Sequence, residues 1–210
     1  MKTADVKQWF IDNKDNARNG TIEYRGISFT ADKPYIFREP NQAYIDAEIE
    51  WYMTQDRNVD VLANLYGRRV KIWDDVADSN GIINSNYGWC IFSSQNGSQF
   101  HHVLQELKNN PDSRRAVMLY NRPTMHTDAT TLGRQDFVCT NAVQYFIVDG
   151  KLEVIVQMRS NDLVFGYNND YAWQRYVQDK LANLLELKLG EITWQVGSAH
   201  IYERHFNLLV

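Results

Sequence analysis

Cys139 is the residue whose surroundings most clearly indicate chemistry. It stands among small polar residues in Asp136-Phe-Val-Cys-Thr-Asn-Ala-Val-Gln144, a segment that otherwise has the character of an apolar strand. A lone cysteine in a strand is more often a small buried hydrophobe than a nucleophile, and we interpret the second cysteine, Cys90, in that way. The polar neighbours of Cys139 need buried partners of their own, which favours a pocket and makes Cys139 a candidate nucleophile.

Two other groups of polar residues could complete such a pocket. Arg159-Ser-Asn-Asp162 interrupts an apolar run, Val154 to Met158, with a cation, a hydroxyl, an amide and a carboxylate. Pro111-Asp-Ser-Arg-Arg115 is a turn that could present two guanidiniums to a phosphate dianion. The same two residues, Arg114 and Arg115, could equally be a solvated pair at the start of a strand.

Three further side chains have both a functional and a structural interpretation. His200 and Tyr202 share one face of a predicted strand by its period of two, so they could contact a ligand or pack as a core pair. Glu48 lies between apolar residues of a predicted helix, where helical spacing places it on a solvated flank as readily as in a pocket. The sequence leaves both alternatives open.

The composition limits the classes of protein to which these residues can belong. The chain of 210 residues is 44% hydrophobic, which fits a single domain over 1–210. A formal charge of -4 gives no overall basic footprint, so we expect no direct nucleic-acid partner. The two cysteines lack the spacing of a disulfide scaffold or a zinc site, and we expect no metal. With no apolar signal region and no apolar window of about 20 residues, we expect a cytoplasmic protein without membrane contact.

Hydrophobic periodicity predicts the elements that would position these residues. Asn41 is a good N-cap for one helix, and Asp149-Gly150 is a two-residue hairpin signal between two strands. A phase shift at Gly26 indicates a bulge or a turn within another strand. The order of elements is typical of an α+β fold, with helices against an antiparallel or mixed sheet. The expected helices are 5–13, 41–52, 100–107 and 169–189, and the expected strands are 21–30, 116–120, 138–148, 152–158 and 191–202.

Taken in order, these motifs resemble those of the thymidylate synthase superfamily. Within it the chain is most similar to the phage-type deoxycytidylate hydroxymethylases, in blocks such as Ile83-Asn-Ser-Asn-Tyr-Gly-Trp89 and Asn169-Asp-Tyr-Ala-Trp173. The resemblance covers most of the chain and implies a thymidylate synthase-like α+β fold that dimerises through its sheet. The matching motifs are Tyr87-Gly, Asp112-Ser-Arg-Arg115, Cys139 followed by Gln144, Arg159-Ser-Asn-Asp162, Gly166 and His200-Ile-Tyr202.

The resemblance implies transfer of a one-carbon unit from 5,10-methylenetetrahydrofolate to C5 of dCMP, for synthesis of modified DNA precursors in a phage-infected bacterium. The Cys139 thiolate would add to C6 and make C5 nucleophilic, and Arg159 with the arginine pair would lower the thiol pKa. Glu48 would organise water and move protons at the base. Water would complete a hydroxymethyl group, whereas hydride would complete a methyl group. The alternatives are therefore a dCMP or dUMP C5-methyltransferase, or a nucleotide-binding homologue with little activity.

The resemblance also implies binding roles. Trp73 and Tyr87 would contact the folate, although Trp73 could also be a core aromatic. Arg114 and Arg115 would come from the partner subunit of a homodimer to hold the 5'-phosphate. Gln144 would lie at the dimer-facing sheet or near the nucleotide. The implied nucleotide-binding set is Arg114, Arg115, Gln144, Arg159, Ser160, Asp162, Asn169, His200 and Tyr202.

Asp170 stands at the position that reads the base in this family. Members that act on deoxyuridylate have an asparagine there, whose amide can accept from N3–H and donate to O4. A carboxylate can only accept, so Asp170 complements the amino group of cytosine and implies dCMP rather than dUMP. If the alignment slipped by one residue, Asn169 would take this position and the preference would reverse.

Two departures from the family concern the ends of the chain. Relatives carry a basic residue in the N-terminal phosphate loop, where this chain has Asn16, so Lys14 or Arg18 would have to replace it. Relatives also continue past the His-x-Tyr strand into a segment that closes over the folate, whereas this sequence stops at Val210. We therefore expect the nucleotide site to follow the family more closely than the folate site.

Overall fold

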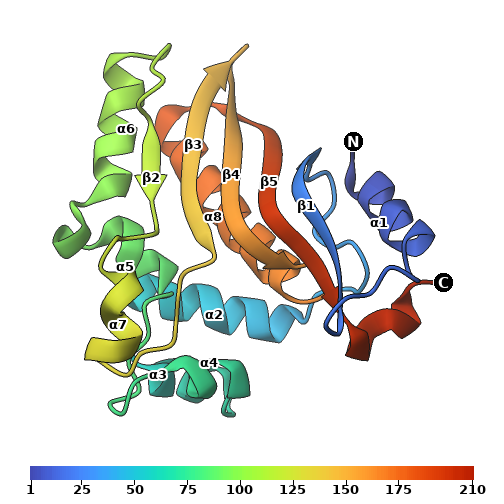
Figure 1. Ribbon diagram of the computed structural model, residues 1–210. Coiled ribbons are helices and arrows are strands. Elements are labelled where there is room, and N and C mark those ends of the chain that lie inside the picture. The colour runs from blue at the N-terminus through green and yellow to red at the C-terminus, as the bar shows by residue number, and fades with distance from the viewer.

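A five-stranded sheet forms the centre of the computed structural model, which describes residues 1–210 (Figure 1). The strand order is β1-β5-β4-β3-β2. The pair β4 and β5 is parallel and the other three pairs are antiparallel, so the predicted α+β class with a mixed sheet is confirmed. The strands are β1 (Thr21–Thr30), β2 (Val117–Leu119), β3 (Thr140–Val148), β4 (Lys151–Asp162) and β5 (Lys188–Tyr202).

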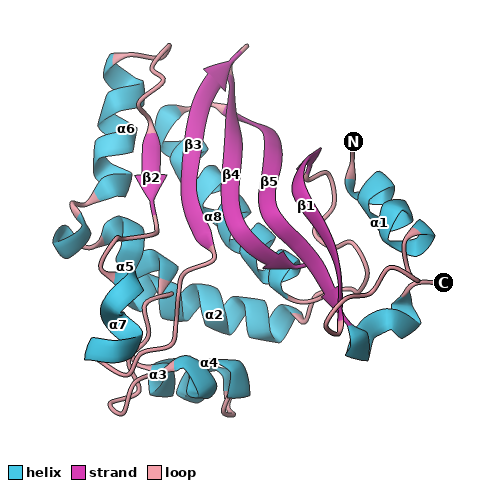
Figure 2. Cartoon of the chain, viewed as in Figure 1, coloured by secondary structure: helices cyan, strands magenta, loops and turns pink.

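The helices cover one face of the sheet and its two edges (Figures 1 and 2). In Figure 1, α8 lies behind the strands, α2 runs below the lower ends of β3 and β4, α6 lies beside β2 and α1 lies beside β1, so the sheet face toward the viewer carries no helix. The helices are α1 (Thr3–Asp12), α2 (Gln42–Thr54), α3 (Val59–Tyr66), α4 (Lys71–Val76), α5 (Tyr87–Phe92), α6 (Gln99–Asn109), α7 (Met125–Thr131) and α8 (Gly166–Leu185), with 3-10 turns η1 (Ser94–Asn96) and η2 (Glu203–Leu208).

Alternation along β4 separates the core from the open face of the sheet. Val154 and Val156 are buried on the side of α8, whereas Gln157 is exposed on the other side. Because successive side chains of a strand point to opposite faces, β-branched residues at every second position suffice to build this core. The fully buried Trp194 of β5 packs edge-on against Tyr167 of α8 at 5.3 Å between ring centroids, and the fully buried Trp173 of α8 packs edge-on against Tyr52 of α2 at 5.1 Å.

Several predicted elements are confirmed closely. β1 has the predicted bounds, and the Asn41 side chain accepts from the Tyr44 N–H at the start of α2, as an N-cap does. Asp149 and Gly150 join β3 to β4 with φ of 48° and 72°, the left-handed values that a tight hairpin needs. The bulge expected at Gly26 is wrong, because the pairing of β1 with β5 keeps one register on both sides of it. Gly26 instead absorbs the phase shift through its φ of 67°.

Hydrophobic periodicity did not predict the remaining helices, because they are short. α3, α4, α5 and α7 have six to eight residues each, too few for a clear 3.6-residue period. α8 begins and ends a few residues before its predicted bounds. Its C-terminal cap is Glu186 in the left-handed conformation, where glycine is the usual signal.

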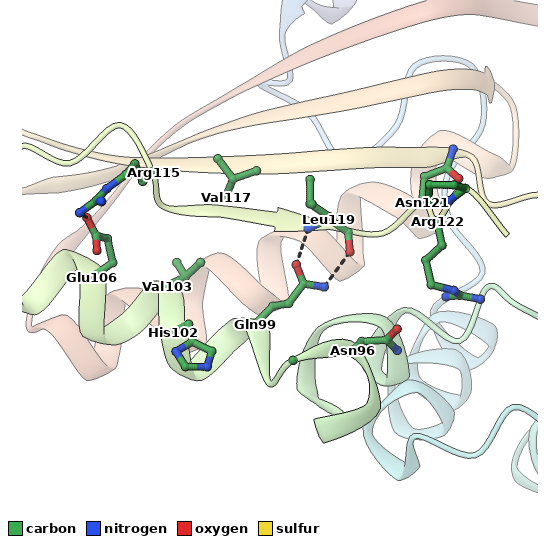
Figure 3. Close-up of a pocket in the computed structure, with 12 residues that line it drawn as sticks. Asn96, Gln99, His102, Val103, Glu106, Arg115, Val117, Leu119, Asn121 and Arg122 are labelled. Atoms are coloured by element: carbon green, nitrogen blue, oxygen red, sulfur yellow. Dashed lines mark hydrogen bonds and ion pairs between the residues drawn. The ribbon is translucent and has the colours of Figure 1, made fainter. Parts of the chain in front are cut away.

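A side-chain amide closes the outer edge of the sheet at β2. Gln99 of α6 donates to the Leu119 carbonyl and accepts from the Leu119 N–H, both at 2.7 Å (Figure 3). The amide thus occupies the backbone N–H and carbonyl of Leu119, with which a further strand would pair. This protects the exposed edge of the sheet. A cavity of about 510 Å³ lies beside it between α6 and β2, with Arg115 and Arg122 in its lining (Figure 3).

Candidate active site

Cys139 lies immediately before β3, where the segment that precedes it reaches the end of β4. Its carbonyl accepts from the Arg159 N–H at 2.9 Å, so thiol and guanidinium belong to paired backbone segments. The Arg159 Nη2 lies 3.5 Å from the Cys139 sulfur and also donates to the Phe137 carbonyl at 2.6 Å, while its Nε donates to the Val138 carbonyl at 3.1 Å. The residues that lead to the thiol therefore hold the cation in place beside it.

The pKa of the Cys139 thiol lies above its ordinary value, so the expected fall is wrong. Burial raises the pKa of Cys139 to about 11, and the Arg159 guanidinium only partly offsets this. The carboxyls of Asp170 and Asp136 act in the same direction as burial, because a nearby negative charge disfavours a thiolate. The thiol is therefore protonated at neutral pH.

Glu48 is inside the site and not on a solvated flank of α2. Its side chain is 3% exposed, and its Oε1 accepts from the Tyr44 hydroxyl at 2.6 Å. The Tyr44 hydroxyl in turn accepts from the Trp73 indole N–H at 2.9 Å. Burial raises the pKa of Glu48 to about 7, and hydrogen bonds from Tyr44, Tyr52 and Trp73 limit the rise. A carboxyl with such a pKa can take up and release a proton near neutrality.

Asp170 is the second carboxyl of the site. Burial, and then the neighbouring Glu48, raise the pKa of Asp170 to about 8. Its Oδ2 accepts from the Asn161 side-chain amide at 2.8 Å. Gly166 leaves room for this contact, because a Cβ there would lie 3.3 Å from the Asn161 Nδ2. Asp170 and its neighbour Asn169 on α8 are both partly buried, and Asn169 donates its backbone N–H to the Phe165 carbonyl.

The two aromatic residues implied to contact folate have different settings. Tyr87, at the start of α5, is 4% exposed, and its hydroxyl accepts from the Thr140 hydroxyl at 3.1 Å. Burial raises the pKa of Tyr87, and Asp170 and Cys139 lie close enough to raise it further. Trp73 on α4 is partly exposed and packs edge-on against Trp51 at 5.7 Å between ring centroids. Tyr87 thus joins the thiol and carboxyl cluster, while Trp73 borders Glu48.

Four residues of the implied nucleotide set lie at the same end of the sheet as Cys139. In the parallel pair of β4 and β5, Asp162 aligns with His200 and Ser160 with Ser198. The rings of His200 and Tyr202 are edge-on at 4.9 Å, and the Tyr202 side chain is 36% exposed. The Asp162 Oδ1 accepts from the Val164 N–H at 3.0 Å, which fixes the turn into α8.

The arginine pair and Gln144 do not join this cluster. Val117 aligns with Gln144, so Arg115 lies near the level of residue 146, seven residues along β3 from the thiol. At about 3.4 Å per residue in an antiparallel strand, the separation is roughly 24 Å. Gln144 donates to the Arg114 carbonyl at 2.9 Å, and the exposed Arg115 pairs with Glu106 at 3.1 Å. Within one chain these arginines cannot reach a ligand at Cys139.

A buried polar clamp holds the irregular segment that precedes Cys139, and the sequence analysis missed it. The Asp136 carboxylate accepts from the Asn84 N–H, the Ser85 N–H and the Ser85 hydroxyl at 2.6 to 2.8 Å. Arg134 pairs with Asp78 at 2.6 Å, and both side chains are less than a tenth exposed. Asn161 was likewise not singled out, although it stands within the polar motif of β4. The signal for the clamp was a cluster of Asn, Ser and Asp residues in segments without apolar periodicity.

Neither a metal centre nor a membrane span is present among residues 1–210. No three or more His, Cys, Asp or Glu side chains are placed together so that they could hold a metal ion. No helix is both long enough and apolar enough to cross a bilayer.

The fold and the site define an α+β protein with a thiol near the buried carboxyl of Glu48 and the partly buried carboxyl of Asp170, and comparison with known proteins identifies the family. The family model described as thymidylate synthase matches residues 37–210. The deoxycytidylate 5-hydroxymethyltransferases of Enterobacteria phages T4 and T2 are each 50% identical over 196 residues, which cover 90% of this chain and 78% of theirs. The structure of thermostable thymidylate synthase A from Bacillus subtilis superposes with a TM-score of 0.75 at 24% identity, over 100% of this chain and 83% of that one. The chain belongs to the thymidylate synthase family.

Proposed function

We propose that this protein is a deoxycytidylate 5-hydroxymethyltransferase that uses 5,10-methylenetetrahydrofolate and supplies modified DNA precursors. The observation that carries the proposal is the partly buried carboxyl of Asp170, whose charge acts on the Cys139 thiol and which stands where the resemblance places the residue that reads the base. The phage relatives at 50% identity, which bear the name of this activity, support it.

The first step would be addition of the Cys139 sulfur to C6 of dCMP. A bond forms between sulfur and C6, the C5–C6 double bond supplies electrons to the ring, and the thiol proton leaves to a base. Glu48, with a pKa of about 7, would act as the base that accepts this proton. Asp170, which holds a proton at neutral pH, would share it with N3 and so neutralise the charge that develops in the ring.

The second half of the reaction would use water. The folate supplies a one-carbon unit at the methylene level when it is bound. Once that carbon is attached to C5, loss of the C5 proton to a base would release it from its donor and leave an exocyclic methylene on the ring. Water would add to this methylene and give up a proton, and the sulfur would leave C6 as a thiolate, which restores the C5–C6 double bond. Glu48, with Tyr44 donating to it at 2.6 Å, would orient that water and accept its proton.

The rest of the nucleotide would lie along the ends of β4 and β5. Arg159 and Ser160 would hold the 5'-phosphate, since a guanidinium and a hydroxyl both donate to phosphate oxygens. His200 and Tyr202 would hold the 3'-hydroxyl from the next strand. Asp162 would hydrogen-bond the pyrimidine or the folate.

Trp73 would support the folate rings at the mouth of the site. Its neighbour Ile72 is 61% exposed, and Phe165 at the start of α8 is 41% exposed. Exposed large apolar side chains next to a polar pocket fit a flat aromatic ligand. Tyr87 would contribute only its hydroxyl, because its ring is stacked on Tyr52 at 5.3 Å between centroids.

The functional unit would be a homodimer formed through the open face of the sheet. That face carries no helix (Figure 1), and it presents Ile155 and Gln195 at the centre and Leu119, 57% exposed, at its edge. A second copy would cover these side chains. Arg114 and Arg115, remote from the Cys139 of their own chain, would then hold the phosphate in the partner's site.

Incubation with dCMP and 5,10-methylenetetrahydrofolate, followed by product mass spectrometry, tests the proposal. We expect 5-hydroxymethyl-dCMP, which differs from the methyl product by one oxygen. Cys139→Ala should abolish turnover, whereas Cys90→Ala, at a buried cysteine that is 1% exposed, should keep it in the folded fraction. Turnover by Cys139→Ala would contradict the mechanism, and binding of dCMP without any product would contradict the assignment as an enzyme.

A further inference from the structure

A chain of hydrogen bonds runs from the core of the sheet to the residue that reads the base. The indole N–H of Trp194 donates to the Asn161 Oδ1 at 3.1 Å, and the Asn161 Nδ2 donates to the Asp170 Oδ2 at 2.8 Å. Trp194 is fully buried in β5 and Asn161 is 3% exposed in β4. We propose that Trp194 and Asn161 are positioning residues for base specificity, because they determine which oxygen of Asp170 accepts and which one donates. The inference rests on the proposed function.

The indole of Trp194 determines which atoms donate and which accept along this series of hydrogen bonds. An indole N–H can donate but cannot accept, so the carbonyl oxygen of Asn161 must face Trp194. The amide nitrogen of Asn161 must then face Asp170, and it can only donate. The Asp170 Oδ2 therefore accepts this hydrogen bond, and the carboxyl proton is favoured on Oδ1, because the unprotonated oxygen of a carboxylic acid is the stronger acceptor.

Asp170 carries that proton at neutral pH. Burial and the nearby Glu48 keep its pKa at about 8, and Asp162 acts in the same direction. The hydrogen bond from Asn161, together with Tyr87, opposes the rise but does not cancel it. The groups that face Asp170 are Glu48 and Tyr52 from α2, Tyr87 from α5, Tyr120 after β2, Cys139 before β3, and Asn161 and Asp162 from β4.

An acid with its proton fixed on one oxygen presents one donor and one acceptor in a set order. Neutral cytosine offers the matching pair, since N3 accepts from Oδ1–H and the 4-amino group donates to Oδ2. Uracil has the opposite donor and acceptor pattern at these two positions. Its N3–H would meet the Oδ1–H donor, and its O4 would meet the lone pairs of Oδ2. A site that leaves two buried polar groups unmatched rejects the wrong base strongly.

Loss of the indole donor should weaken this rejection. In Trp194→Phe the side-chain amide of Asn161 is free to flip, so that its carbonyl oxygen faces Asp170. The Asp170 proton can then lie on Oδ2 and donate to that oxygen. Oδ1 is left as an acceptor for the N3–H of uracil. We expect the ratio of kcat/KM for dCMP to that for dUMP to fall by about tenfold or more. Both rates are measured on one preparation, so a loss of folded protein cancels in the ratio.

Trp173→Phe is the matched control. Trp173 is also fully buried, lies on the helix of Asp170, and donates its indole N–H at 3.1 Å to the Tyr120 hydroxyl, which takes no part in the hydrogen bonds between Trp194, Asn161 and Asp170. It should lose stability as Trp194→Phe does and keep the wild-type ratio. Asn161→Leu should lower the ratio as well, and adding Trp194→Phe to it should change nothing more, because both act through one chain.

The outcomes separate the inference from the proposed function. An unchanged ratio in Trp194→Phe, in a protein that hydroxymethylates dCMP, would overturn the inference and leave the function intact. Equal falls in Trp194→Phe and Trp173→Phe would also overturn it, because general loosening of the core would then explain the change. A wild-type protein that does not convert dCMP would instead overturn the function on which the inference rests.

Discussion

The guanidinium of Arg159 lies 3.5 Å from the sulfur of Cys139, and yet the pKa of that thiol remains high, at about 11. Burial disfavours the thiolate more than one cation favours it, and two carboxyls near the thiol strengthen the effect. Arg159 also donates two hydrogen bonds to the carbonyls of Phe137 and Val138. The resting protein therefore holds a protonated nucleophile.

Alkylation of the free protein should report this protonated thiol. At pH 8 only about one thousandth of a thiol with this pKa is ionised, so Cys139 should react slowly with iodoacetamide and faster up to pH 10 or above. Arg159→Met should slow the reaction about tenfold at pH 8, and Arg159→Lys less, because the cation favours the thiolate. Mass spectrometry identifies the modified cysteine, and Cys90, whose pKa burial raises to about 12, should stay unmodified. A midpoint below pH 9 would contradict the prediction.

The carboxyls of Glu48 and Asp170 should make the fold less stable as the pH rises. Their pKa values rise on folding, from 4.5 to about 7 for Glu48 and from 3.8 to about 8 for Asp170. The folded state then binds more protons than the unfolded state, so this stability is complete below pH 4 and is lost as the pH rises through 7 to 8. The double variant Glu48→Gln, Asp170→Asn should not lose it, and its Tm should exceed that of the wild type at pH 8.5 by about 5 °C. Parallel Tm curves for both proteins from pH 5 to 8.5 would refute this.

Replacement of the base-reading carboxyl should change the substrate. An asparagine at position 170 can accept from N3–H and donate to O4, so Asp170→Asn should shift preference from dCMP toward dUMP by at least about 10²-fold. Competition between the two nucleotides, read by product mass, measures the shift. Asn169→Asp is the control for the neighbouring position on α8 and should leave the preference as it is. A shift in Asn169→Asp alone would show that residue 169 reads the base.

Local signals in the sequence were sufficient for most strands but not for the clamp around Cys139. β1 and the hairpin at Asp149-Gly150 could be predicted because alternation and turn chemistry act within a few residues. The clamp joins Asp136 to Ser85, which lie 51 residues apart, and no local pattern encodes such a contact. Segments that bond through side chains have no period to detect.

The site residues show the same division. Motif order indicated Cys139, Arg159 and Asp170, and the structure brings them together at one end of the sheet. The direction of the thiol pKa could not be predicted, because it depends on how much burial outweighs one cation. Asn161 belongs to the motif Arg159-Ser-Asn-Asp162, but no role could be predicted for it, because its contact with Trp194 joins two different strands.

Hybrid dimers should show whether the arginine pair acts across an interface. The double variant Arg114→Ala, Arg115→Ala and the variant Cys139→Ala should each be nearly inactive alone. Co-expression gives hybrids in which one site has its own Cys139 and both arginines of the partner, so about a quarter of wild-type activity should return. Size-exclusion chromatography with light scattering verifies the dimers. Absence of recovery in proven hybrids would place the arginines in the site of their own chain, against the distance along β3.

The clamp on Asp136 should set the position of the nucleophile. Ser85→Ala removes one of the three donors to that carboxylate, the hydroxyl at 2.7 Å, and leaves both backbone N–H groups. We expect kcat to fall about tenfold while the dissociation constant of dCMP changes less than twofold, because a displaced thiol affects bond formation more than binding. Thr3→Val is the matched control, since the buried Thr3 hydroxyl donates to Asp32 at 2.7 Å and its backbone N–H donates to the same carboxylate. It should cost comparable stability, about 1 kcal/mol, without a change in kcat. Equal kcat in both variants would show that the clamp supports only the fold.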